Sequence, residues 1–364
     1  MPKDQRPAGS RGDGDGGRPR RRRRVPSPSG SAQPPTMSSV ARAANVSPAT
    51  VSRVLNGLPT VNDEHRRRVL AAVAELNYRP NRVGRSLRRQ RSSMIGVVVA
   101  DIENPHFNSM VRVVENIAYR AGYRVLLCNT DETAEKQREY LQVLEDERVL
   151  GVLLSPSNPA GTEIAALLDI GIAVVALDRP VADERADAVV TDNVAASRLG
   201  TEHLIALGHV RIGFISGPMD VGSGKDRLEG YELAMAAAGL ERLVADGGFR
   251  IEGGRRACSE LLAGGHRMTA LMVANNLMTI GALAEMRAAG VRIPADIALV
   301  SVDDPPWAAV TQPPLTVLAQ PVEEMAKAAM KLLIERIEGR RDEPRQLVLP
   351  LELRVRESSG HIVV

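Results

Sequence analysis

The chain has 364 residues, with 47 lysines and arginines against 44 aspartates and glutamates, a formal net charge of +3. Its two cysteines, Cys128 and Cys258, exclude a disulfide scaffold and have no metal-ligand spacing, so we expect buried thiols in a reducing compartment. The charge is polarised: residues 1–93 hold 20 basic and 6 acidic side chains, leaving 27 against 38 in the remainder. This asymmetry indicates a polyanionic partner for the first quarter of the chain, bound less tightly as salt is added.

Residues 1–35 are rich in Gly, Pro, Ser and Arg, with arginines at every position from 20 to 24. The segment lacks the apolar core of a signal peptide or a membrane anchor, so we expect it to be neither. Its composition predicts a disordered basic tail.

Residues 36–57 predict two short helices joined by a tight turn. Thr36 is a good N-cap and is followed by apolar residues at helical spacing. Asn45 stands at the turn, where a left-handed backbone is needed and asparagine tolerates it. Ser47 can cap the second helix, and Pro48 is favoured at its first position. The second helix turns three apolar residues inward: Val51, Val54 and Leu55.

A third helix is predicted to start at Asn62, with Val69, Val73 and Leu76 as its buried stripe. Together the three helices form a helix-turn-helix unit over residues 36–80, whose second helix would enter a DNA major groove. The alternative is a small helical bundle without such a role. The concentration of positive charge in this part of the chain favours DNA binding.

Residues Val40–Asn56 and Leu76–Asn81 resemble the DNA-binding headpiece of the lactose repressor family of bacterial transcription regulators, and the similarity extends over about residues 36–357. One departure is Asn45, where the family usually has glycine. The resemblance implies base reading by Pro48, Ala49 and Arg53, of which only Arg53 can donate bidentate hydrogen bonds to guanine. The DNA-binding residues carried over are Ser47, Pro48, Ala49, Thr50, Ser52, Arg53, Asn56, Tyr78, Asn81 and Leu87.

Residues 81–92 have two interpretations. They can be a basic, solvated linker, since the segment combines Gly84 with several arginines that repel one another. The resemblance instead implies a hinge helix that folds only on DNA and inserts Leu87 into the minor groove. Neutralisation of the arginines by phosphate would favour that folding.

From Ser93 onward, short apolar runs alternate with longer amphipathic stretches. This is typical of buried parallel strands with helices between them, an α/β fold. About 270 residues exceed one domain, so two doubly wound lobes are favoured. Seven strands are predicted: Ile95–Ala100, Arg124–Cys128, Val149–Leu154, Ala173–Leu177, Arg211–Ile215, Ala270–Val273 and Ile297–Val302.

The family resemblance implies the same architecture for residues 93–364, similar to periplasmic sugar-binding proteins. The lobes would span about 94–191 and 192–320. The chain would cross back near Gln320, so that residues 321–364 complete both lobes.

Polar residues follow most of the predicted strands: Asp101, Ser155, Asp178, Asp192, Ser216, Asn275, Asn276, Asp303 and Asp304. In open α/β sheets, ligands bind outside the carboxyl ends of the strands. A single aspartate there is commonplace as a turn or cap residue. A ring of such residues on two facing lobes predicts a cleft suited to a polyhydroxylated small molecule.

The resemblance carries nine effector-binding positions onto this chain: His106, Phe107, Asp178, Ser223, Arg227, Phe249, Asn275, Asp303 and Gln320. Arg227 could clamp two hydroxyls or a carboxylate, and Asp303 could accept from adjacent hydroxyls. For both, the alternative is a structural salt bridge across the cleft. Asn276 stands where the family commonly has aspartate, so the usual acceptor is in doubt at that position.

Aromatic side chains make up 2% of the chain, so Phe107, Phe249 and Trp307 are candidates to stack on a sugar ring. A core position is the alternative for the two phenylalanines. The six histidines are scattered, and neither a nucleophile elbow nor a complete phosphate loop occurs. We therefore expect no enzymatic activity, no cofactor and no metal.

These features predict a cytoplasmic transcriptional regulator that acts as a repressor. A homodimer would bind a roughly palindromic DNA operator, and a small sugar-like effector between the lobes would control its affinity. Two alternatives stay open: a solute-binding receptor with the same two-lobed fold, and a regulator that uses a nucleobase corepressor.

Overall fold

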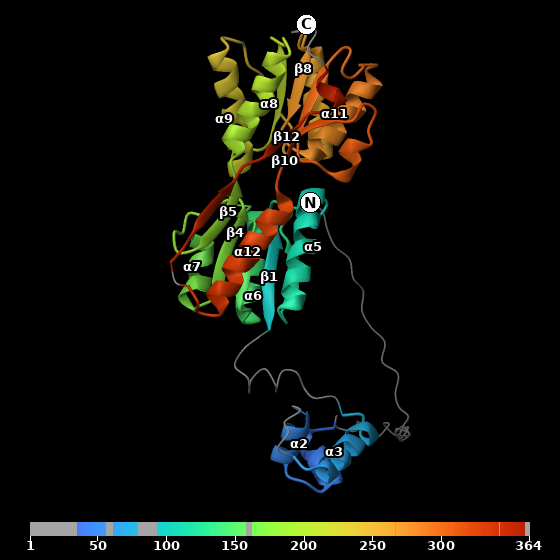
Figure 1. Cartoon of the computed structure of the whole chain (residues 1–364), viewed down its shortest axis with the longest axis vertical. Coiled ribbons are helices and arrows are strands. Elements are labelled where there is room, and N and C mark those ends of the chain that lie inside the picture. The colour runs from blue at the N-terminus through green and yellow to red at the C-terminus, as the bar shows by residue number, and fades with distance from the viewer. Residues whose placement is uncertain are drawn as a thin grey trace, which may run out of the picture. The chain divides into compact units, whose positions relative to one another are not determined.

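The computed structural model describes residues 35–55, 61–78, 93–157, 162–265, 267–341 and 343–360. The chain divides into two compact units, residues 1–88 and 89–364 (Figure 1). The expected tail up to residue 34 and the hinge segment 81–92 lie outside the described residues. Among the helices that are described, none is long and apolar enough to cross a membrane.

The described part of the first unit contains three helices, α1 (Met37–Ala44), α2 (Pro48–Leu55) and α3 (Asp63–Glu75). The predicted caps are confirmed: Thr36 accepts from the backbone of α1, Ser47 from that of α2, and Asn62 from that of α3. Asn45 has a φ of 49°, so the predicted left-handed turn between α1 and α2 is also confirmed.

A small apolar core holds these three helices together. Val40, Val51 and Val69 are fully buried at its centre, one from each helix. Val73 and Leu76 are only partly buried, which differs from the predicted stripe. Ala72 takes the buried position beside Val69, because its small side chain allows α3 to pack closely.

The second unit has two lobes, each built on a six-stranded sheet. In lobe 1 the strand order is β11-β5-β4-β3-β1-β2, and all neighbouring strands are parallel. The strands are β1 (Met94–Val99), β2 (Arg124–Asn129), β3 (Gly151–Leu154), β4 (Ala173–Asp178), β5 (Asp187–Thr191) and β11 (Gln346–Leu349). The helices are α5 (Pro105–Arg120), α6 (Ala134–Asp146), α7 (Thr162–Asp169) and α12 (Val322–Ile337).

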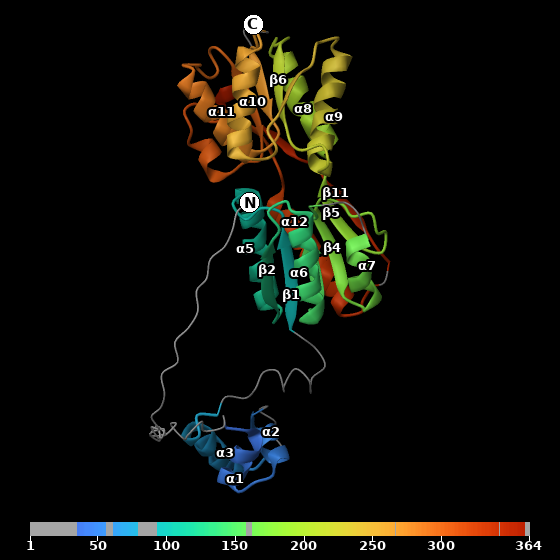
Figure 2. The same ribbon diagram turned by 180° about the vertical axis from the view of Figure 1, so that it is seen from behind.

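Alternation along the strands of lobe 1 creates two cores. Val97 and Val99 pack with α5 and α12, whereas Val98 packs with α6 and α7 on the opposite face. Figure 1 shows α12, coloured as a C-terminal element, among the cyan and green elements of this lobe. Figure 2 shows α6 and α7 from behind.

In lobe 2 the strand order is β12-β10-β9-β8-β6-β7, parallel except for β12, which runs antiparallel to β10. The strands are β6 (Ile212–Ser216), β7 (Leu243–Asp246), β8 (Ala270–Val273), β9 (Ala298–Val302), β10 (Thr316–Ala319) and β12 (Glu352–Arg354). The helices are α8 (Asn193–Ala206), α9 (Gly222–Ala237), α10 (Ile251–Ala263) and α11 (Asn276–Ala288), with 3-10 turns η1 (Pro306–Ala309) and η2 (Glu357–Ser359).

The chain passes between the lobes three times: from β5 to α8, from β10 to α12, and from β11 to β12. The doubly wound fold class is confirmed, and all seven predicted strands are present. Five further strands of the described residues were not predicted. Three of them, β7, β11 and β12, are edge strands with no more than three consecutive apolar residues, in which exposed residues alternate with buried residues in β7 and with partly buried residues in β11 and β12.

Glycines allow helices of lobe 2 to pack in direct backbone contact. A Cβ atom at Gly230 of α9 would lie 2.2 Å from the carbonyl oxygen of Val194 and 2.8 Å from the amide nitrogen of Arg198, both on α8. Neither backbone atom can move aside without displacing the helix, so the distance between α8 and α9 depends on this glycine.

We predict that Gly230→Ala lowers the free energy of unfolding by about 1–3 kcal/mol, because the added methyl forces α8 and α9 apart. Urea unfolding of the full chain measures this. Gly222→Ala on the same helix is the matched control, because a Cβ there meets nothing within 4 Å. Equal stability of the two variants would contradict the prediction.

Candidate functional site

A pocket lies between the two lobes, beyond the carboxyl ends of strands from both sheets. The cavity itself is narrow, about 20 Å³, within about 400 Å³ of empty space that includes open solvent. The residues that line it are Asp101, Asn104, His106, Phe107, Glu132, Asp178, Arg179, Ser223, Arg227, Phe249, Asn275, Asp303 and Gln320. All nine residues carried over from the family resemblance are in this set, so the structure brings them together.

Four lining residues were not among those nine. Asp101 is one of the polar residues that follow predicted strands, and Asn104 stands before Pro105 as a helix cap would. Arg179 directly follows a predicted site residue. Glu132 gave no sequence signal, because its position depends on contact with Arg179 from another loop.

The nine polar residues that follow predicted strands describe the pocket only in part. Asp101, Asp178, Asn275 and Asp303 line it, whereas the other five members do not. Two of those five have structural roles instead. Asp192 caps α8, and Asp304 forms ion pairs with Arg354 and Arg356. Trp307 also lies outside the pocket lining and packs against the core of lobe 2, so it is not a stacking residue of this pocket.

Asp178 and Asp303 occupy equivalent places in the two lobes. Asp178 is the last residue of β4 and Asp303 directly follows β9, and their φ angles are 72° and 76°. Aspartate is among the few residues that tolerate this left-handed conformation. The conformation turns each carboxylate from the end of its strand into the pocket, where both are buried.

His106 lies in the first turn of α5, and its Nε2 is 3.1 Å from Oδ1 of Asp178. Its Nδ1 is 3.9 Å from Oδ1 of Asp303 in the other lobe. Burial alone would lower the pKa of His106, but the hydrogen bond and charge of Asp178 and the charge of Asp303 raise it above its ordinary value. Burial likewise opposes ionisation of Asp178, yet contact with His106 and two arginine charges hold the pKa of Asp178 at about 2.

The neighbours of Asn276 explain why an asparagine stands at this position instead of an aspartate. Its Nδ2 donates to Oδ2 of Asp303 at 2.7 Å and to Oδ1 of Asn104, in the other lobe, at 2.8 Å. Both partners are acceptors, and a carboxylate at position 276 could donate to neither and would repel Asp303. Gln320 donates to the second oxygen of Asp303 at 2.7 Å. Asn276 therefore serves as a donor that orients Asp303 and bridges the lobes.

Arg227 is buried in lobe 2 and held by neutral acceptors. Its Nε donates to Oδ1 of Asn193 and its Nη1 to the carbonyl oxygen of Ala274, both at 2.7 Å. Burial lowers the pKa of Arg227, and the charges of Asp303 and Asp178 oppose that shift. The alternative of a salt bridge across the cleft is thus wrong for Arg227 among the described residues, whereas Asp303 has such a contact with His106 of the other lobe. Two nitrogens of the guanidinium are fixed by these hydrogen bonds. Its charge lines the pocket without forming an ion pair with any of the described residues.

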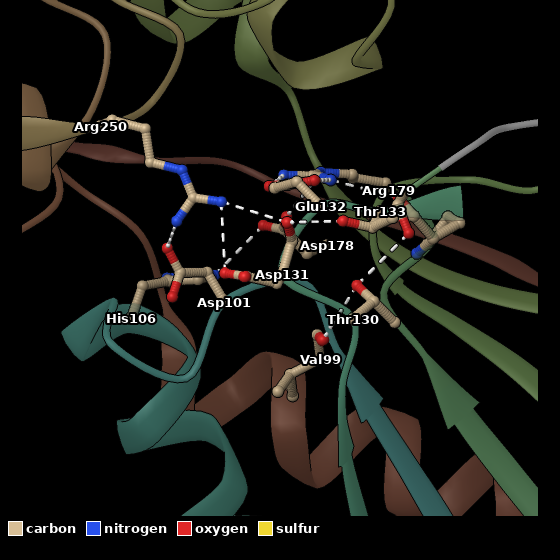
Figure 3. A network of polar contacts seen from close by, with 12 residues as sticks. Val99, Asp101, His106, Thr130, Asp131, Glu132, Thr133, Asp178, Arg179 and Arg250 are labelled. Atoms are coloured by element: carbon tan, nitrogen blue, oxygen red, sulfur yellow. Dashed lines mark hydrogen bonds and ion pairs between the residues drawn. The ribbon is translucent and has the colours of Figure 1, made fainter. Parts of the chain in front are cut away.

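Arg179 and Glu132 form a bidentate pair on the lobe 1 side of the pocket (Figure 3). Both nitrogen–oxygen distances are 2.6 Å, and Nη1 also donates to the carbonyl of Pro156 at 3.2 Å. The pair neutralises two buried charges and fixes the plane of the guanidinium. Burial lowers the pKa of Arg179, but Glu132 more than restores it.

Some buried polar atoms around the pocket have no hydrogen-bond partner in the described part of the chain. They include Nδ1 of His106 and Nε of Arg179, two residues that line it. Buried polar groups without partners are costly and rare in folded proteins. A polar ligand in the pocket would supply the missing partners.

Helix α2 presents the predicted base-reading residues. Pro48, Ala49 and Arg53 are exposed, as a DNA-reading surface requires. Ser47 accepts from the amide of Thr50 at 3.1 Å, and the two hydroxyls are 2.9 Å apart, so both take part in the helix cap.

The remaining DNA-binding predictions have different outcomes. Ser52 is half-buried on α2, and Tyr78 is only 7% exposed within the core of the first unit. Asn56, Asn81 and Leu87 lie outside the described residues.

Comparison with known proteins covers both units. Residues 36–81 match the family described as bacterial regulatory proteins, lacI family, and residues 201–359 match the periplasmic binding protein-like domain. A ribose operon repressor from Halalkalibacterium halodurans is 37% identical over 324 residues, covering 89% of this chain and 97% of that protein.

Solved structures give the same result. A complex of the transcriptional regulator CelR with cellobiose aligns with a TM-score of 0.67 and 35% identity, over 89% of this chain and 99% of that chain. The lac repressor dimer bound to operator and the anti-inducer ONPF aligns with a TM-score of 0.78 and 29% identity, over 90% and 100%.

The His106–Asp178 pair predicts a pH-dependent stability. A raised histidine pKa gives stabilisation that is present below 6.5 and lost as the pH rises through the folded-state value. A lowered aspartate pKa gives stabilisation that is present above 3.8 and lost as the pH falls toward about 2, worth about 2 kcal/mol. We therefore expect His106→Gln to cost most stability between about pH 4 and 6.5 and less in alkaline solution. Thermal unfolding across pH measures this.

His209→Gln is the control for this experiment. Burial lowers the pKa of His209, so its charging destabilises the fold in acid. That variant should gain stability relative to the wild type as the pH falls below 6.5, the opposite sign. A pH-independent effect of His106→Gln would show that the pair is not ionised as described.

Proposed function

The chain belongs to the lacI family of bacterial regulatory proteins, and on that premise we propose that its inter-lobe pocket binds a small, uncharged sugar that controls the affinity of the headpiece, residues 36–78, for operator DNA. The protein is a DNA-binding transcriptional regulator and not an enzyme. We further propose a cytoplasmic homodimer on a roughly palindromic operator, supported by the dimeric lac repressor structure.

The observation that carries the sugar proposal is the balance of charge and hydrogen-bonding capacity in the pocket. Glu132 is paired with Arg179, Asp178 with His106, and Asp101 with Arg250. The positive charge of Arg227 is balanced by the negative charge of Asp303, which also lines the pocket. An anion or a cation would therefore unbalance the site, whereas hydroxyls both donate and accept and suit its mixture of groups.

The apolar walls of the pocket support a monosaccharide. Phe107 and Phe249 line it and are 3% and 6% exposed, which suits packing against the faces of a sugar ring. Ribose is the first candidate, because the relative from Halalkalibacterium halodurans is named a ribose operon repressor.

The architecture supports coupling between the pocket and DNA. The pocket draws residues from both lobes, and the three chain passages let the lobes change their relative angle as the ligand enters. Effector binding and DNA binding must then alter each other by the same factor, commonly about 1–3 kcal/mol. The predicted hinge over residues 81–92, including Leu87, would transmit this change, and it stays a proposal.

We expect D-ribose to bind the full chain and Arg227→Lys to weaken that binding roughly 10- to 100-fold. Lysine keeps the charge but loses the planar fork that hydrogen-bonds Asn193, Ala274 and the ligand together. Isothermal titration calorimetry measures the affinity. Arg242→Lys, in an exposed ion pair with Glu232, is the matched control and should bind as the wild type does. A response to nucleobases and to no sugar would refute the sugar proposal.

We expect Arg53→Ala to reduce discrimination at one operator base pair by roughly 1–3 kcal/mol. Operator sites selected from genomic fragments, followed by fluorescence anisotropy at several salt concentrations, measure this. Arg120→Ala, an exposed arginine at the end of α5, should leave the affinity unchanged. If the wild type showed no preferred sequence and no salt dependence, the DNA-binding proposal would fail.

A further inference from the structure

Arg250 of lobe 2 reaches across to lobe 1 at the edge of the pocket (Figure 3). It is the N-cap residue of α10. Its Nη1 donates to Oδ2 of Asp101 at 3.0 Å. Its Nη2 donates to the backbone oxygen of Asp131 at 3.1 Å and lies 3.3 Å from the Oδ1 of that residue. One guanidinium therefore binds two separate loops of the opposite lobe.

The lobe 1 side is built to receive this guanidinium. Asp101 is 4% exposed, and its Oδ1 already accepts from the amide of Glu103 at 2.9 Å. Asp131 and Glu132 are successive left-handed residues, with φ angles of 58° and 60°. This unusual turn is fixed by a hydrogen bond of 2.9 Å from the Glu132 amide to the Ala100 carbonyl. It aims the Asp131 carbonyl at Arg250 and the Glu132 carboxylate at Arg179.

The lobe 2 side is also constrained. Phe249, directly before Arg250, has a φ of 58° and lines the pocket. Its left-handed backbone directs consecutive side chains apart, so that Phe249 faces the ligand space while Arg250 crosses to lobe 1. Arg250 itself does not line the pocket, although its partner Asp101 does.

We propose that Arg250 is a positioning residue that clasps the lobes together over the bound effector and so sets the effector affinity without touching the effector. The contacts with Asp101 and Asp131 exist only when the lobes are close together. Opening the pocket must break all of them and leave the Asp101 carboxylate without its counter-ion. This inference rests on the proposed function for the identity of the ligand, but the clasp itself can be tested without one.

The test compares Arg250→Gln with Arg255→Gln in the full chain. Arg255 is one turn further along α10 and is paired with Glu252 and Glu285 inside lobe 2, so its replacement removes the same charge without an inter-lobe contact. With D-ribose as the probe, we expect Arg250→Gln to raise the dissociation constant roughly three- to tenfold, since the side chain is partly exposed. Arg255→Gln should bind as the wild type does.

Salt and a second variant identify the mechanism. Near 1 M salt the Debye length falls to about 3 Å, so the difference between the wild type and Arg250→Gln should shrink. Asp131→Asn should also weaken binding, and the double variant with Arg250→Gln should be less than additive, because both changes remove one shared contact.

Hydrogen exchange of the ligand-free chain provides the second readout. The Glu132 and Thr133 amides should exchange faster in Arg250→Gln than in the wild type or Arg255→Gln. Unchanged exchange together with unchanged ribose affinity would overturn the clasp. If the wild type did not bind ribose, the ligand assignment would fail, and the exchange data alone would decide the clasp.

Discussion

The structure depends on the pairing of ionised side chains that two parallel sheets bury at their facing ends. An isolated charge in this place would be costly, so each needs a counter-charge or fixed dipoles. Asp178 meets His106, and Glu132 meets Arg179. Asp303 is held by the amides of Gln320 and Asn276. These contacts leave a pocket that is neutral as a whole but rich in polar atoms, a combination that selects polyhydroxylated molecules over ions.

The same contacts explain how two separately packed lobes act together. Each lobe has its own apolar core. Among the described residues, polar contacts that join the lobes include Asn276 with Asn104, His106 with Asp303, and Arg250 with Asp101 and Asp131. Arg250 and Asp131 are partly exposed, so their contact can be exchanged for hydration at small cost. The angle between the lobes is therefore sensitive to a ligand that adds contacts to both.

The headpiece is stabilised in a different way, by helix caps as well as by its core. Its core consists of a few valines and alanines around Tyr78, too small to fix three helices by burial alone. Caps at Thr36, Ser47 and Asn62 satisfy the helix ends, and the left-handed Asn45 sets the turn. An asparagine in place of the family's usual glycine is tolerated there because its short polar side chain fits that backbone region.

The headpiece and the doubly wound lobes could be predicted from local signals in the sequence, namely helix caps and apolar periodicity. The nine pocket residues came from the family resemblance, and only Asp178, Asn275 and Asp303 among them also stood out as polar residues after predicted strands. The edge strands, the role of Asn276 as a donor, the Arg179–Glu132 pair and the reach of Arg250 to Asp101 were decided by the tertiary structure alone. Each depends on which groups from distant segments meet in space, and the energy of a buried charge is set by those neighbours rather than by the residue type.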